Sequence, residues 1–328
     1  MTSEAASELE VSAAVAAVRA ASAMCRRVQG RLVAGDTLTK GDTSPVTIAD
    51  FAAQAIVNAT LTDALGTFAM VGEEDSNDLR SDEATTLLDG VVDLVRTQRG
   101  DHVNASTVLQ WIAAGATDGT GRRYWTLDPI DGTKGFVRGD QYAIALALIE
   151  HGVVQLGVLG CPNLPNADGS VGAIFVATDR GCEAYYSEAA VGVPAHVASP
   201  TSLADARFCE SVESGHSNQN DSARIAELLG ITASPYRIDS QCKYAAVARG
   251  DASIYLRLPT RADYREKIWD HAAGKLVVER AGGRVTDVDG RPLDFSVGAK
   301  LANNRGVVAT DGRFHDDVLA AVAEVLGR

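Results

Sequence analysis

The sequence predicts a mixed helix-and-strand protein, built as two domains from 328 residues. Three observations lead to this fold class. The first 65 residues contain two long segments with helical periodicity, the middle of the chain contains apolar runs typical of strands, and the last third alternates strand and helix patterns. Such alternation favours helices packed on a sheet, and the chain is long enough to bury a substantial core.

The N-terminal part is expected to be largely helical. Residues 7–33 are rich in alanine and valine at helical spacing, and a second helix is expected over 46–65, after a polar connector at 35–45. The apolar run at 68–72 ends in glycine, which is typical of a buried strand followed by a turn. Residues 75–121 are interpreted as a helical insertion with a surface loop, with helices near 86–96 and 106–114.

Strand patterns dominate the middle of the chain. Strands are expected over 123–127, 142–149 and 153–159, with a hairpin turn between the last two. A less regular stretch at 163–195 holds another strand near 172–177 and is the expected domain junction. Beyond it, strand and helix patterns alternate over 207–211, 221–229, 236–238, 242–249, 253–258 and 270–280.

Composition excludes several classes of partner. The formal net charge of −13 disfavours a large basic surface for a nucleic acid polymer. No segment approaches the roughly 20 apolar residues that span a bilayer, so no membrane partner is expected. The acidic N-terminus lacks signal- and transit-peptide features, so we expect a cytoplasmic protein, or an organellar one from which a leader has been removed. The five cysteines show no CxxC spacing, which predicts neither a zinc site nor a disulfide framework.

Acidic residues stand at four places where a catalytic carboxylate could be presented. Glu73 follows the predicted strand at 68–72, Asp128 and Asp131 follow the next strand, Asp270 opens a predicted helix, and Asp50 lies within one. In Asp128-Pro-Ile-Asp131-Gly-Thr133 the proline and glycine favour an abrupt turn, so that both aspartates can face one point. The Ile130 carbonyl between them would add a further oxygen ligand.

This ligand set suits a hard divalent cation. Mg²⁺ prefers oxygen ligands and keeps several waters, and two such ions about 4 Å apart can clamp the attacking and leaving oxygens of a phosphoryl transfer. Each element also has a structural alternative. Asp-Pro and Asp-Gly are common turn dipeptides, Asp270 could cap its helix, Glu73 could be a loop acid, and Asp50 a satisfied polar residue.

Taken together, these segments resemble the signature of the inositol monophosphatase superfamily of Mg²⁺-dependent, lithium-sensitive phosphatases, and they occur in its order. The resemblance implies metal ligands at Glu73, Asp128, Asp131 and Asp270, and Thr133 as the group that orients a metal-activated water for in-line attack, with Asp50 accepting from the threonine. It also implies a layered αβαβα sandwich with an α+β domain at 1–195, an α/β domain at 196–328 and the active site between them.

Further motifs resemble the 3′(2′),5′-bisphosphate nucleotidases of plants and fungi. They are Asp128-Pro-Ile-Asp-Gly-Thr-Lys-Gly-Phe-Val-Arg-Gly-Asp-Gln-Tyr142, Glu213-Ser-Gly-His216-Ser217, Asp239-Ser-Gln-Cys-Lys-Tyr244, Tyr255-Leu-Arg257-Leu-Pro259 and Tyr264-Arg-Glu-Lys-Ile-Trp-Asp-His271. The resemblance implies that Ser240, Lys243 and Arg257 bind the 5′-phosphate and that Glu213, His216 and Ser217 line the nucleotide pocket.

These substrate-binding assignments also have structural alternatives. A second phosphate needs its own cations, because the metals are committed to the scissile one, and lysine and arginine supply them. Alternatively, Ser240 could be a helix N-cap, Lys243 a solvated first-turn residue and Arg257 the partner of a surface acid. Two further cations, Lys134 and Arg138, could steer phosphate or neutralise nearby carboxylates, and the sequence leaves this open.

The resemblance implies a Mg²⁺-dependent enzyme with two or three ions that hydrolyses the 3′-phosphate of adenosine 3′,5′-bisphosphate, with 3′-phosphoadenylyl sulfate as a second substrate and Li⁺ as an inhibitor. It implies a small-molecule substrate and no protein partner. The nearest rival is an inositol polyphosphate 1-phosphatase with the same metal site. A non-catalytic nucleotide sensor is a second rival, but sensors usually lose a metal ligand or the water-activating group, and all are present here.

Overall fold

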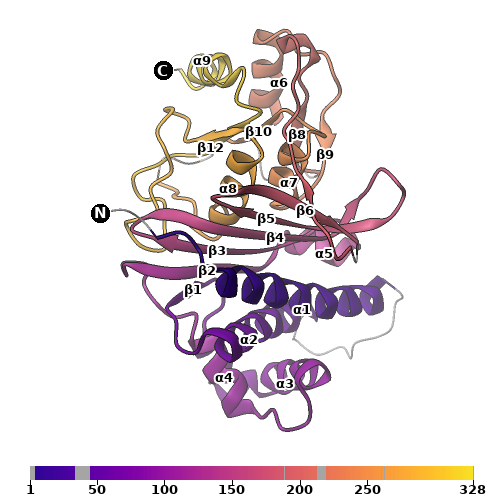
Figure 1. Cartoon of the computed structure of the whole chain (residues 1–328), viewed down its shortest axis with the longest axis vertical. Helices are drawn as coiled ribbons and strands as arrows, with labels where there is room; N and C mark the ends of the chain where they lie inside the picture. The colour runs from indigo at the N-terminus through magenta and orange to yellow at the C-terminus, as the bar shows by residue number, and fades with distance from the viewer. Residues whose placement is uncertain are drawn as a thin grey trace.

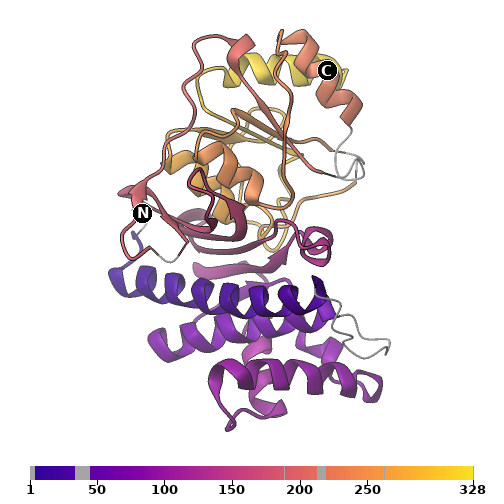
Figure 2. The same cartoon turned by 90° about the vertical axis from the view of Figure 1, so that its right-hand side faces the viewer.

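The protein is a stack of alternating helical and sheet layers. The computed structural model describes residues 4–33, 45–187, 189–212, 219–259, 261 and 263–327. Two N-terminal helices cover one face of a seven-stranded sheet, two later helices lie between that sheet and a five-stranded one, and two more cover the outer face of the second sheet (Figures 1 and 2). The layers therefore follow the expected αβαβα order.

The elements alternate along the chain as follows. The helices are α1 Glu8–Val33, α2 Pro45–Leu65, α3 Thr85–Arg99, α4 Ala105–Ala113, α5 Thr133–Arg138, α6 Gln219–Leu228, α7 Cys242–Ala248, α8 Ala272–Arg280 and α9 His315–Val325. The first sheet contains β1 Met70–Gly72, β2 Arg123–Asp131, β3 Ala143–Glu150, β4 Val153–Pro165, β5 Val171–Thr178, β6 Gly181–Tyr186 and β7 Val193–Pro194. The second contains β8 Phe208–Glu210, β9 Tyr236–Arg237, β10 Ile254–Arg257, β11 Arg284–Thr286 and β12 Val307–Thr310.

The first sheet follows chain order from β1 to β7 and is buried on both faces. Only β1 and β2 run parallel, and the other neighbours are antiparallel. Every residue of β3 is buried. Its alanines and Ile149 face α7 and α8, while Ile144, Leu146 and Leu148 face α1 and α2. A strand covered on both sides needs apolar residues at every position, which explains the continuous apolar run in the sequence.

Glycines let helices approach this sheet closely on both sides. A β-carbon on Gly160 of β4 would lie 2.6 Å from Val18 of α1, and one on Gly157 would lie 2.9 Å from the Ala273 carbonyl of α8. Any other residue at these positions would push the helix away.

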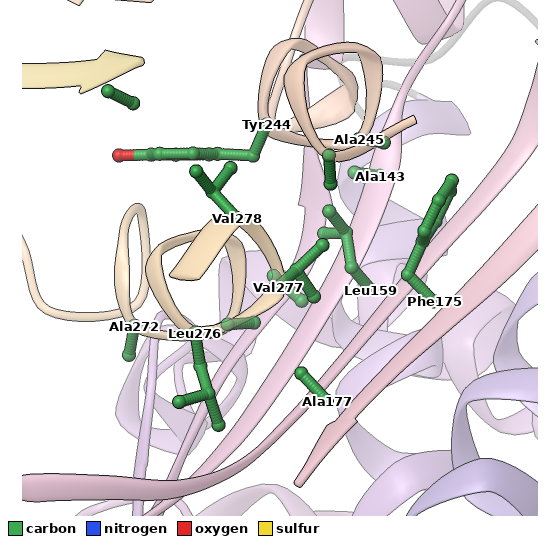
Figure 3. Close-up of a cluster of buried hydrophobic side chains, with 14 of the residues drawn as sticks. Ala143, Leu159, Phe175, Ala177, Tyr244, Ala245, Ala272, Leu276, Val277 and Val278 are labelled. Carbon is green, nitrogen blue, oxygen red and sulfur yellow. The ribbon is translucent and has the colours of Figure 1, made fainter. Parts of the chain in front are cut away.

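Helices α7 and α8 form the middle layer and share a core with both sheets. Leu276 and Val277 of α8 pack with Leu159 and Ala177 of the first sheet (Figure 3). Tyr244 lies on the side of α7 that faces α8. A β-carbon on Gly274 of α8 would lie 2.2 Å from its ring, so glycine is what admits this buried tyrosine.

The second sheet has the order β11-β12-β10-β8-β9, with β10, β8 and β9 parallel and β12 antiparallel to its neighbours. Its outer face forms a separate core with α6 and α9 that includes Phe208, Ile225, Leu256 and Val322. Of the helices that the structure describes, none is long and apolar enough to cross a membrane.

The predicted helices and strands through residue 280 are found, with shifted bounds. The strand predicted over 123–127 ends too early. As β2 it continues to Asp131, because a bulge between Asp128 and Asp131 removes the need for a ladder hydrogen bond from Pro129, and the sharp turn follows at Gly132. The sequence did not indicate β6, β7, β11, β12 or α9.

Two other expectations stay open. The connector at 35–44 lies outside the described residues. The division after residue 195 remains a prediction, since one core joins both sheets through α7 and α8.

We expect Gly274→Ala to lower the melting temperature. Alanine favours a helix by about 1 kcal/mol over glycine, but overpacking a buried site costs roughly 1–3 kcal/mol, and here the added carbon meets the Tyr244 ring. The matched control is Gly30→Ala in α1, where nothing lies within 4 Å of the new β-carbon, and this variant should be slightly more stable than the parent. Thermal unfolding followed by circular dichroism measures both. Equal stability of the two variants would contradict the proposed packing of Tyr244.

Candidate active site

Two parallel strands bring the first two carboxylates together. Gly72 at the end of β1 pairs with Leu127 of β2, so the next residues along each strand, Glu73 and Asp128, lie side by side. Their carboxyl groups are close enough for each to shift the pKa of the other. Asp128 is almost completely buried, with 2% of its surface exposed. This pairing follows from strand register, which the sequence alone does not contain.

A bulge and a sharp turn then place Asp131. The register runs from Asp128↔Ala145 to Asp131↔Ala143, which leaves Pro129 and Ile130 without cross-strand partners. Gly132 follows with φ of 91°, a left-handed conformation that favours glycine, and α5 begins at Thr133. The chain therefore reverses directly after Asp131, at the glycine that the sequence indicated for a sharp turn.

The turn before α7 holds Asp131 in place. The Gln241 backbone N–H donates to the Asp131 carboxylate, and a β-carbon on Gly132 would lie 2.6 Å from Cβ of Ser240. Ser240 itself has φ of 63°, which is uncommon for a residue other than glycine. The Gln241 side chain donates to the Trp269 carbonyl at 3.0 Å, one residue before Asp270. Gln241 thus connects Asp131 with the segment that carries Asp270.

The four predicted metal carboxylates lie close enough to perturb one another. Burial raises the pKa of Asp128 well above its usual value, and the charges of Glu73, Asp131 and Asp270 raise it further. Burial likewise raises the pKa of Asp270 to about 7, with contributions from Asp131 and Glu73. Crowded buried carboxylates repel each other unless protons or cations neutralise them.

One atom of this cluster indicates which kind of ligand would suit it. Oδ1 of Asp128 is buried and has no hydrogen-bond partner among the described residues. Buried polar atoms are normally satisfied, and a buried carboxylate oxygen beside other carboxylates suits a cation. The oxygen-only donor set fits Mg²⁺ rather than a soft metal.

Asp50 lies beside this cluster on α2. It is 9% exposed, and burial followed by the charges of Glu74 and Glu73 raises its pKa well above the usual value. Gln54, one turn later, fixes the neighbouring loop: its amide donates to the Glu74 carbonyl at 2.6 Å and its oxygen accepts from the Glu74 N–H at 3.1 Å. In the described part of the chain Asp50 and Thr133 are not hydrogen-bonded to each other, so their proposed relay remains a prediction.

A cavity of about 330 Å³ opens onto two of the four carboxylates, Asp131 and Asp270. It brings six of the thirteen predicted site residues into one space between the N-terminal turn of α5, the start of α7, the end of β10 and the start of α8. Asp50, Glu73, Asp128 and Ile130 do not line it. Its lining includes the predicted residues Asp131, Thr133, Ser240, Lys243, Arg257 and Asp270. Lys134 also lines it, whereas Arg138 forms ion pairs with Asp140 and Asp239, which supports a neutralising role for Arg138.

The predicted phosphate-binding residues occupy well-defined positions on this cavity. Lys243 is only 6% exposed, not a solvated first-turn residue, and its ammonium group lies 5.4 Å from the centre of the Tyr255 ring. Arg257 lies at the end of β10, and its Nε is 3.5 Å from the buried Glu266 rather than from a surface acid. The Ser240 hydroxyl accepts from the Cys242 N–H at 3.2 Å, so part of its role is local capping.

Some predicted residues cannot be placed, and some neighbours were missed. Glu213, His216 and Ser217 lie outside the described residues. Seven cavity residues were not predicted as site residues: Gly132, Gly135, Ser211, Asp239, Gln241, Tyr255 and His271. Asp239, Gln241 and Tyr255 fall within the motifs quoted above. Their residue types alone do not indicate a role in the site, so only their position on the cavity identifies them as site residues.

Comparison with known proteins agrees with this geometry. The chain is 46% identical over 344 residues to the 3′(2′),5′-bisphosphate nucleotidase of Schizosaccharomyces pombe, covering 98% of this chain and 97% of that protein. It is 45% identical to the protein of the same name from Oryza sativa, covering 97% of this chain and 94% of that one. The resemblance to plant and fungal nucleotidases is therefore confirmed.

Solved structures show the same fold at low sequence identity. The inositol monophosphatase from Zymomonas mobilis matches with a TM-score of 0.62 at 20% identity, covering 97% of this chain and 99% of that one. CysQ from Bacteroides thetaiotaomicron matches with a TM-score of 0.60 at 19% identity, covering 92% of this chain and 97% of that one. The predicted layered fold is thus confirmed. Residues 6–326 match the inositol monophosphatase family, and the chain belongs to that family.

Proposed function

We propose that this chain is a Mg²⁺-dependent phosphomonoesterase that removes the 3′-phosphate from adenosine 3′,5′-bisphosphate, and that it also accepts 3′-phosphoadenylyl sulfate. The observation that carries the proposal is one cavity lined by the carboxylates Asp131 and Asp270 and by the cations Lys243 and Arg257. A substrate with two phosphates matches these two kinds of group. Relatives with 45% and 46% identity are named for this activity.

The carboxylates of Glu73, Asp128, Asp131 and Asp270 would hold the metal, with the Ile130 carbonyl as a further ligand. The unpartnered Oδ1 of Asp128 and the mutual repulsion of these groups support this assignment. Two or three ions are proposed. When bound, such ions activate a water for attack and neutralise charge on the scissile phosphate.

The remaining residues orient the reactants. Thr133, exposed on the cavity wall, is proposed to orient the attacking water, and Asp50 to accept the threonine proton. Lys243 and Arg257, with Ser240, would bind the 5′-phosphate and so hold the 3′-phosphate in line. The water oxygen then bonds to phosphorus as the bond to the ribose 3′-oxygen breaks. The attacking water gives up one proton and the 3′-oxygen takes up one, which yields AMP and inorganic phosphate.

The first prediction concerns substrate choice. Phosphate release should be much faster from adenosine 3′,5′-bisphosphate than from inositol 1,4-bisphosphate in the presence of Mg²⁺, and Li⁺ should inhibit it. Preference for the inositol substrate would keep the metal site and reject the nucleotide pocket. Release from neither would favour the non-catalytic sensor.

The second prediction concerns pH and metal. The folded-state pKa of Asp270, about 7, lies above the ordinary value of 3.8, so the folded protein binds this proton more tightly than the unfolded chain. Stability from that proton is present at low pH and is lost as pH rises toward 7. Without metal, Asp270→Asn should therefore gain stability relative to the parent between pH 5 and pH 8, by roughly 2 °C or more in melting temperature.

Thermal unfolding in EDTA at both pH values measures this gain. Adding Mg²⁺ should raise the melting temperature of the parent more than that of the variant, because the variant lacks one ligand. A gain that is the same at both pH values would contradict the crowding of carboxylates around Asp270.

The third prediction concerns the remote phosphate. Lys243→Met removes a buried charge at similar side-chain volume, and should raise KM for adenosine 3′,5′-bisphosphate roughly tenfold, with a smaller change for adenosine 3′-monophosphate. The matched control is Lys275→Met on α8, which removes an ammonium group that pairs with Glu279 and does not line the cavity. Equal effects of Lys243→Met on both substrates would remove Lys243 from the 5′-phosphate site.

A further inference from the structure

We propose that Glu266 is a positioning residue that fixes the guanidinium of Arg257, and that His271 and Tyr244 hold Glu266 in place. The inference rests on the proposed function and deepens it. It assigns the preference for a bisphosphate over a monophosphate to a buried network behind the cavity as well as to the cations on its wall.

The network is a continuous chain of polar contacts. Tyr244 Oη lies 2.7 Å from Nδ1 of His271, and Nε2 of His271 lies 3.3 Å from Oε2 of Glu266. The other Glu266 oxygen, Oε1, accepts from Nε of Arg257 at 3.5 Å. With the imidazole proton on Nε2, Tyr244 donates to His271 and His271 donates to Glu266. The Glu266 carboxylate then accepts from both His271 and Arg257.

Burial makes this arrangement rigid. Glu266 and His271 expose 5% and 2% of their surface, and Tyr244 exposes none. Burial would raise the pKa of Glu266, but the hydrogen bond from His271 and the charge of Arg257 lower it overall. Glu266 is therefore a buried anion that needs its donors, and Arg257 is one of them.

Tyr244 also packs against the tyrosine that contacts Lys243, the second cation of the site. The Tyr244 ring meets the Tyr255 ring edge-on at 5.0 Å, and Nζ of Lys243 lies 5.4 Å from the centre of the Tyr255 ring. Tyr255 and Arg257 are two residues apart on β10, so they point to the same face of the sheet. One buried aromatic pair thus lies behind both cations.

The chemical consequence is preorganisation. A free arginine side chain loses rotamer entropy when it binds a ligand, whereas an arginine that is already fixed lost that entropy on folding. The contact engages Nε and sets the plane of the guanidinium, so the terminal nitrogens approach a phosphate in one orientation.

Glu266, Asp270 and His271 could alternatively form a cation site, since one ligand atom from each lies within 4.8 Å of the others. The contacts favour the positioning role. Both oxygens of Glu266 and both nitrogens of His271 already have partners, so a cation would have to displace them.

The test is the ratio of kcat/KM for adenosine 3′,5′-bisphosphate to that for adenosine 3′-monophosphate, which lacks the remote phosphate. Glu266→Gln keeps the side-chain shape and should lower this ratio about tenfold, mainly through KM for the bisphosphate. Tyr244→Phe should also lower this ratio, but by a smaller factor. Arg257→Lys should lower it too, and Glu266→Gln in that background should add little, because both changes act on one contact. Glu279→Gln, which removes a carboxylate paired with Lys275 on α8, is the matched control and should leave the ratio unchanged.

The outcomes are distinguishable. An unchanged ratio in Glu266→Gln, or effects that add fully to those of Arg257→Lys, would overturn the inference. A raised Mg²⁺ requirement in Glu266→Gln, equal for both substrates, would overturn it in favour of the cation site. Lack of bisphosphate preference in the unmodified protein would instead reject the proposed function itself.

Discussion

Repulsion between buried carboxylates is the constraint on which the rest of the site depends. Glu73 and Asp128 lie side by side on two parallel segments. Burial raises the pKa of Asp128, and the charges of Glu73, Asp131 and Asp270 raise it further. Such a cluster is costly in a metal-free protein. It is held together because each carboxylate stands on, or within two residues of, an element that packs in an apolar core, and the first sheet is covered by helices on both faces.

A short polar link joins the two halves of the site, in addition to the core that the two sheets share through α7 and α8. Gln241 donates its backbone N–H to Asp131 and its side-chain amide to the Trp269 carbonyl, next to Asp270. The strained turn at Ser240, with φ of 63°, allows this geometry because Gly132 offers no side chain to collide with it. One residue therefore contacts both carboxylate-bearing segments, which come from distant parts of the chain.

How far the sequence predicts this structure depends on the range of the forces involved. Local periodicity locates α1, α2 and the apolar strands, and turn chemistry draws attention to Asp128 and Asp131. It misplaces the end of β2, because a bulge depends on the partner strand. Short strands such as β9 and β11, of two and three residues, are stabilised by neighbours distant in sequence, and β11 leaves no pattern. The resemblance to a family grouped the predicted residues into one site. The roles of Gln54 and Gln241 follow only from contacts with residues 20 and 110 positions away, and the role of Glu266 only from its contact with the buried His271.

Cations and carboxylates that line one small cavity would neutralise each other if all were free to move. Here Lys243, Arg257 and the neighbouring Arg138 each contact a group other than the predicted metal ligands. Lys243 lies over Tyr255, Arg257 is held by Glu266, and Arg138 pairs with Asp140 and Asp239. Arg257 is near enough to Asp270 to lower its pKa, so without Glu266 it would have a competing partner there. Because these contacts keep the cations from pairing with the predicted metal ligands, the carboxylates remain available to a metal and the cations to a second phosphate. The two charge types can then coexist in about 330 Å³.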